Sequence, residues 1–85
     1  MPSTTVAVGS SIGLHARPAA VIADAVSSGG IPVTLAVAGG EPVDAGSALM
    51  IMTLGATQGV EVIVTSDDAD SVAIVAKLVA ADLDA

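Results

Sequence analysis

The sequence predicts a small α+β domain built as a two-layer sandwich, with helices packed on a β-sheet. The chain has 85 residues, which is enough for a single domain, residues 1–85, with one core. Hydrophobic residues make up 53% of it and none is Phe, Tyr or Trp, so the core is packed from small aliphatic side chains. Strand-like and helix-like segments follow in the order β-α-β-β-α-β-α. A sheet with one apolar face needs a cover, and the helices supply it.

The first third of the chain predicts a strand, a loop and a helix. Residues 4–8 (TTVAV) are short and β-prone, whereas residues 9–15 are rich in Gly and Ser and indicate a loop. Residues 16–28 place apolar side chains roughly on one helical face. We expect this face to consist of Ala19, Val21, Ile22, Ala25 and Val26. Gly29-Gly30 should end the helix, because the residue after a helix commonly adopts a positive φ.

A hairpin is predicted next. Residues 32–37 (PVTLAV) and 41–45 (EPVDA) flank Gly39-Gly40, where a tight turn needs glycine. Pro42 cannot donate a backbone hydrogen bond, which restricts the second arm to an edge of the sheet.

The remaining chain predicts a helix, a strand and a helix. Residues 47–54 (SALMIMTL) indicate a short apolar helix with Ser47 as its N-cap. Residues 59–65 (GVEVIVT) alternate between polar and apolar and give the clearest strand pattern. Residues 66–84 continue with apolar side chains at helical spacing. Three acidic residues can cap the first turn of this helix and interact with its positive end: Asp67, Asp68 and Asp70.

Composition excludes several classes of function. The formal net charge is −7, with two basic and nine acidic residues, which argues against binding nucleic acid or an anionic membrane. The absence of cysteine excludes disulfides, thiolate metal sites and thiol catalysis. Apolar runs stay shorter than the about 18 residues that suggest a membrane span, and residues 1–11 lack the features of a signal peptide. We therefore expect a soluble, cytoplasmic domain.

The single histidine, His15, is the strongest candidate for chemistry. Pro18 fits the first turn of a helix, which predicts a helix start just before it and places His15 at or near the N-cap. The backbone amides of Ala16 and Arg17 would then lack helical partners and form an anion site, and the Arg17 guanidinium suits a phosphate group. His15 is thus placed to become a phosphohistidine whose charge is compensated. The same residues also allow a solvated histidine or a simple helix cap, in a small interaction domain where His15 is inert.

Residues 13–19 (GLHARPA) resemble the active-site motif of the HPr family, the histidine-containing phosphocarriers of the phosphoenolpyruvate-dependent sugar phosphotransferase system. Chain length, element order and a Ser-led helix followed by "MTLGA" are also similar to that family. The resemblance implies an open-faced β-sandwich in which a four-stranded antiparallel sheet is covered on one face by three helices.

The resemblance also implies a function for this motif. His15 would accept a phosphoryl group on Nδ1 from phospho-Enzyme I, which is charged by phosphoenolpyruvate, and pass it to the A components of sugar permeases. Arg17 would stabilise the phosphoryl group, together with the amide of Ala16, and Pro18 would fix the helix start. The protein would be a carrier rather than an enzyme, and no cofactor or metal is implied.

The helix at residues 47–54 is implied to have two further roles. Ser47 matches a position that a serine kinase modifies in many relatives, although "GSALMIM" departs from the usual pattern and an ordinary N-cap explains the residue equally. This helix and the first one flank the histidine in the family and dock partners. The candidate contacts are Leu49, Met50 and Met52, of which Met50 is expected to be exposed, while Leu49 and Met52 also fit a core stripe.

Charge is a second departure from the family. Relatives often place lysines near the histidine, but this chain has only Arg17 and Lys77, and Lys77 is expected to be solvated. Docking should therefore depend more on apolar contact than on electrostatic steering, with a small effect of salt on the association rate.

We expect a monomer. An alternative function is a regulatory module of the same fold that serves carbon or nitrogen control through phosphorylation of His15 or Ser47.

Overall fold

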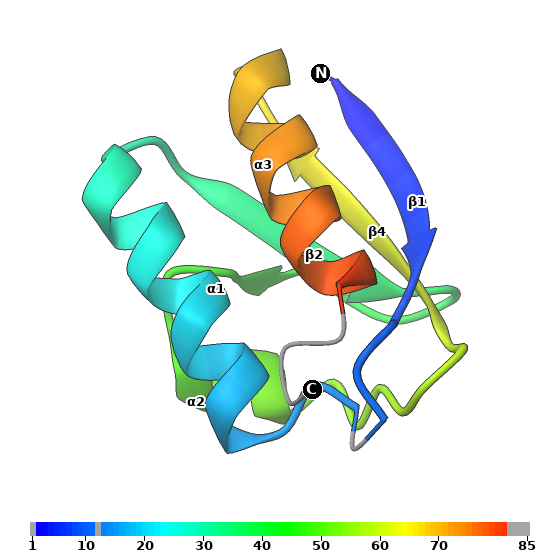
Figure 1. Cartoon of the computed structure of the whole chain (residues 1–85). Coiled ribbons are helices and arrows are strands. Elements are labelled where there is room, and N and C mark those ends of the chain that lie inside the picture. The colour runs from blue at the N-terminus through cyan, green and yellow to red at the C-terminus, as the bar shows by residue number, and fades with distance from the viewer. Residues whose placement is uncertain (1, 12, 82–85) are drawn as a thin grey trace.

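The computed structural model describes residues 2–11 and 13–81, which form a four-stranded antiparallel sheet with three helices on one face (Figure 1). The elements are β1 (Ser3–Ala7), α1 (Ala16–Gly29), β2 (Val33–Val37), β3 (Val43–Asp44), α2 (Ala48–Met52), β4 (Glu61–Ser66) and α3 (Ala69–Ala80). This order and the layered arrangement confirm the predicted fold class. No described helix is long and apolar enough to cross a membrane.

The strands lie in the order β1-β4-β2-β3, so β4 sits inside the sheet and pairs antiparallel with both β1 and β2. Its residues alternate between the two faces as predicted, with Val62 and Val64 fully buried. The strand begins at Glu61 rather than at Gly59, because Gly59 has a φ of 87° and belongs to the preceding turn.

The hairpin between β2 and β3 forms, but its second arm is shorter than the predicted range of 41–45. Only Val43 and Asp44 pair with β2. The resulting strand β3 lies at an edge of the sheet, as predicted from Pro42. Pro42 has no amide to donate. After Asp44 the chain turns, because the Asp44 carboxylate accepts a hydrogen bond of 2.8 Å from the Gly46 amide. The turn between the strands is closed by the Gly40 amide, which donates to the Val37 carbonyl at 2.9 Å.

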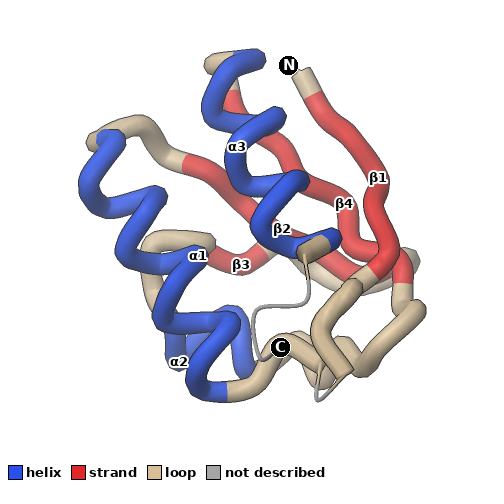
Figure 2. The backbone as a smooth tube through the Cα atoms, in the orientation of Figure 1, coloured by secondary structure: helices blue, strands red, loops and turns tan. Residues whose placement is uncertain are grey.

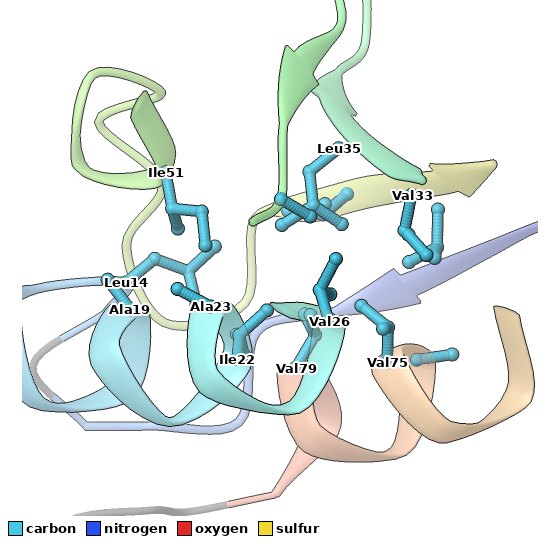
Figure 3. Packing of buried hydrophobic residues seen from close by; sticks show 14 of the residues in the cluster. Leu14, Ala19, Ile22, Ala23, Val26, Val33, Leu35, Ile51, Val75 and Val79 are labelled. Carbon is cyan, nitrogen blue, oxygen red and sulfur yellow. The ribbon is translucent and has the colours of Figure 1, made fainter. Parts of the chain in front are cut away.

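The core lies between the helices and the sheet (Figure 3). Ile22 of α1, Leu35 of β2 and Ile51 of α2 are each fully buried. One expectation for α1 was wrong: Val21 is 38% exposed, while Ala23 is buried. These two residues project about 100° to either side of Ile22, and the core lies on the side of Ala23.

The helix ends follow the local sequence signals. Helix α1 ends at Gly29, and Gly30 adopts a φ of 69° while its amide donates to the Val26 carbonyl. Asp68 caps α3 by accepting a hydrogen bond of 3.0 Å from the Ser71 amide. Asp70 lies in the first turn, as expected, whereas Asp67 lies outside the helix. The part of the predicted last helix beyond residue 81 falls outside the described residues.

Candidate functional site at the N-terminus of helix α1

His15 is the N-cap residue of α1, which confirms the helix start predicted from Pro18. Its backbone is extended, with φ −88° and ψ −167°, and its carbonyl accepts the first helical hydrogen bond, 2.9 Å from the Ala19 amide. The imidazole is exposed and makes no hydrogen bond to the helix end. His15 therefore occupies the cap position without acting as a side-chain cap, and its ring is available to solvent.

Unpaired backbone amides follow His15 directly. Among residues 2–11 and 13–81, the amides of Ala16 and Arg17 have no hydrogen-bond acceptor. Both residues are exposed, whereas Pro18 is buried and has no amide. Free amides at the positive end of a helix dipole attract anions, and the Arg17 guanidinium belongs to the same first turn. The structure thus brings the predicted residues together at one helix end whose chemistry suits an anion.

The loop before His15 is held against a second loop. The Leu14 amide donates to the Ala56 carbonyl at 2.9 Å, and the Leu14 side chain is buried. Gly13 has a φ of 76°, and a Cβ built on it would lie 2.5 Å from the Ala56 carbonyl oxygen and 2.8 Å from the Cα of Thr57. Only glycine fits this close approach in this backbone conformation. We did not predict this contact, although Gly13 begins the GLHARPA motif.

The start of the same loop is fixed by the end of α3. The Gly9 amide donates to the Val79 carbonyl at 3.0 Å, and a Cβ on Gly9 would overlap the Ala80 carbonyl. The Gln58 side chain also donates to the Gly9 carbonyl. The chain leading to His15 is therefore fixed at both ends by contacts with residues far away in the sequence.

Helix α2 packs beside α1 (Figure 2). The expectation that Leu49 fits a core stripe was wrong, because its side chain is 70% exposed. Met50 is 40% exposed, as expected, and Met52 is half-buried and packs against the core. A helix of five residues turns little more than once and buries only Ile51 completely. The exposed Val21 adds a further apolar side chain on α1.

Ser47 is the N-cap of α2, as predicted. Its hydroxyl oxygen accepts a hydrogen bond of 3.3 Å from the Met50 amide, and the residue is half-buried. Its own amide donates to the Asp44 carbonyl at 3.2 Å. In the described part of the chain, no three His, Cys, Asp or Glu side chains gather where they could hold a metal ion.

Comparison with known proteins agrees with this geometry. The family model described as "PTS HPr component phosphorylation site" matches residues 2–81. The phosphocarrier protein HPr of Streptomyces coelicolor is 44% identical over 87 residues, covering 99% of this chain and 94% of that relative.

Solved structures are similar as well. The crystal structure of HPr from Bacillus anthracis superposes with a TM-score of 0.81 at 26% identity, covering 92% of this chain and 95% of that one. The crystal structure of HPr-C-His from Thermoanaerobacter tengcongensis superposes with a TM-score of 0.83 at 28% identity, covering 93% of this chain and 91% of that one. A family match over nearly the whole chain, a relative of high identity and a shared fold lead to one conclusion. This chain belongs to the HPr family of phosphocarrier proteins.

Proposed function

We propose that this protein carries a phosphoryl group on Nδ1 of His15 between phospho-Enzyme I and the A components of sugar permeases, as a cytoplasmic monomer. The observation that carries the proposal is the free, exposed imidazole of His15 beside the unpaired amides of Ala16 and Arg17. A nucleophile and an anion site therefore lie at the same helix end.

The transfer moves one phosphoryl group between two histidines. The bond between phosphorus and the nitrogen of the donor imidazole breaks as a bond forms to Nδ1 of His15, and the donor ring recovers its lone pair. The reverse event at the acceptor returns His15 to its free state. Since donor and acceptor bonds are of the same kind, the carrier contributes positioning and charge compensation.

Charge compensation comes from two sources at the start of α1. A phosphoryl group brings roughly −1.5 to −2 charge units. The helix terminus stabilises an adjacent charge by about 0.3–1 kcal/mol, and a guanidinium makes strong paired hydrogen bonds to phosphate oxygens. Ala16 supplies only its backbone amide, so its side chain is replaceable, whereas Arg17 acts through its side chain.

Apolar contact supports docking of the protein partners. Leu49, Met50 and Val21 are large exposed apolar residues on α1 and α2, the helices that lie side by side next to the His15 loop. Methionine adapts its shape to different partners. We expect successive partners to use this surface in turn, with a small dependence of the association rate on salt.

The test is intact mass after incubation with phosphoenolpyruvate and purified Enzyme I. The wild-type chain should gain one acid-labile phosphoryl group, and His15→Ala should gain none while keeping its fold. Arg17→Ala should be charged more slowly but completely. A wild-type chain that stays unmodified would refute the carrier function, and an Arg17→Ala variant charged at the wild-type rate would refute the charge-compensation argument.

Ser47→Ala serves as the control in this series. Because the Ser47 hydroxyl accepts a capping hydrogen bond from Met50, the substitution should cost about 1 kcal/mol of stability and leave phosphoryl transfer unchanged. Regulation at Ser47 by a serine kinase and phosphatase remains a separate hypothesis, and phosphorylation of this serine by a purified kinase would test it.

A further inference from the structure

A small groove lies between the C-terminal half of α1 and the N-terminal half of α3, with a cavity of about 50 Å³. Helix α1 contributes Ala25 and Gly29 to its lining, α3 contributes Ser71 and Ile74, and Ile31 follows the end of α1. Ile74 is 57% exposed and Ile31 is 37% exposed, so apolar surface reaches solvent here. We call this feature the α1–α3 groove.

The α1–α3 groove is separate from the His15 site. Helix α1 has 14 residues and therefore extends about 20 Å at 1.5 Å per residue. His15 precedes its first residue and Gly29 is its last, so the two features lie at opposite ends of the helix (Figure 1). A partner bound at His15 can leave the groove free.

The surroundings of the groove carry negative charge. The last turn of α1 has no basic residue, so the partial negative charge of its terminal carbonyls is uncompensated on that helix. Asp67 is exposed just before α3, and Asp70 is exposed in the first turn of that helix. Asp70 precedes Ile74 by four residues, which places both on one face of α3. Lys77, the only cation on α3, follows Ile74 by three residues on the same side of the helix, so the negative charge lies on the N-terminal side of Ile74.

We propose that the α1–α3 groove binds a segment of a partner protein in which one aliphatic side chain is flanked by arginine or lysine. The aliphatic side chain would enter the space between Ile31, Ile74 and Gly29. The basic residues would face Asp67, Asp70 and the carbonyl end of α1. A second copy of this chain is a poor occupant, because a net charge of −7 with two basic residues makes copies repel one another.

The probe is a blocked peptide, Arg-Arg-Leu-Arg-Arg, titrated into the ¹⁵N-labelled full chain. We expect amide shifts centred on Ile31, Ser71 and Ile74. Two matched peptides, with serine in place of leucine or glutamate in place of arginine, should each bind at least about tenfold more weakly. Binding should also weaken as salt is raised, because exposed charges contribute to it.

Two variants locate the site. Ile74→Ser removes exposed apolar surface and Asp70→Asn removes one charge, and each should weaken binding severalfold while leaving charging of His15 unchanged. Leu49→Ser is the control, since it deletes an equally apolar, 70% exposed side chain on a different helix, and it should leave peptide binding intact. Shifts centred on Leu49 and Met50, shifts spread over every acidic residue, or shifts at Ile74 that depend on protein concentration alone would each overturn the proposal.

Discussion

Substituting Gly13 by alanine tests whether the contact between the two loops beneath His15 holds the site. The added methyl group meets backbone atoms, 2.5 Å from the Ala56 carbonyl oxygen and 2.8 Å from the Cα of Thr57. Neither atom can move without moving its loop. The same carbonyl accepts the Leu14 amide, so a shift that relieves the overlap also disturbs that hydrogen bond.

Two costs add in this variant. A residue other than glycine in the left-handed region costs about 1–2 kcal/mol, and Gly13 has a φ of 76°. Forcing an extra carbon into packed surroundings costs about 1–3 kcal/mol. The total is roughly 2–5 kcal/mol, which for a domain of this size lowers the melting temperature by at least about 8 °C.

Gly55→Ala separates the two costs. Gly55 also has a positive φ, 63°, but no atom lies within 4 Å of a Cβ built there. It should therefore show the conformational cost alone, and Gly13→Ala should melt lower than Gly55→Ala by about 4 °C or more. Thermal unfolding by circular dichroism measures both, and the rate of phosphoryl acceptance by His15 should fall in Gly13→Ala. Equal melting temperatures for the two variants would show that the close approach to Ala56 does not contribute.

Three further substitutions test the core and the helix ends through urea unfolding. Ile22→Ala empties a fully buried position and should cost about 2–5 kcal/mol; a loss below 1 kcal/mol would contradict the packing described here. Ser66→Ala removes a buried hydroxyl that donates to the Pro32 carbonyl at 2.8 Å and accepts from the Asp68 amide at 3.3 Å, and should cost about 1–3 kcal/mol. If no loss of stability were seen, the Pro32 carbonyl and the Asp68 amide would have to form hydrogen bonds with water instead. Gly29→Ala places a methyl group in open space at the end of α1 and should stabilise the protein by up to about 1 kcal/mol. Destabilisation would mean that the helix end is strained.

Local signals predicted the helix ends and the strand pattern well. Pro18 marks the start of α1 and Gly30 follows its end. Both signals depend on local backbone chemistry that needs no partner elsewhere in the chain. The alternation in β4 follows from its position inside a sheet with one covered face. The position of His15 at the N-cap follows from Pro18 for the same local reason.

Tertiary contacts decided what local signals could not. Val21 and Ala23 flank Ile22 symmetrically on the helix, and only the placement of the helix on the sheet selects Ala23 for the core. The contact between Gly13 and Ala56 joins segments far apart in the sequence, so a pattern within either segment does not reveal it. Leu49 is exposed because α2 is too short to bury two faces.

The outer strand β1 has a consequence for the solubility of the protein. In the described part of the chain, β1 is one edge of the sheet, and its five residues, STTVA, include no charge and no proline. Such an edge can add a strand from another molecule, which starts aggregation. The net charge of −7 opposes this approach by repulsion between molecules. The acidic composition therefore protects an edge that lacks protection of its own, and the protein should aggregate sooner in acid or in high salt.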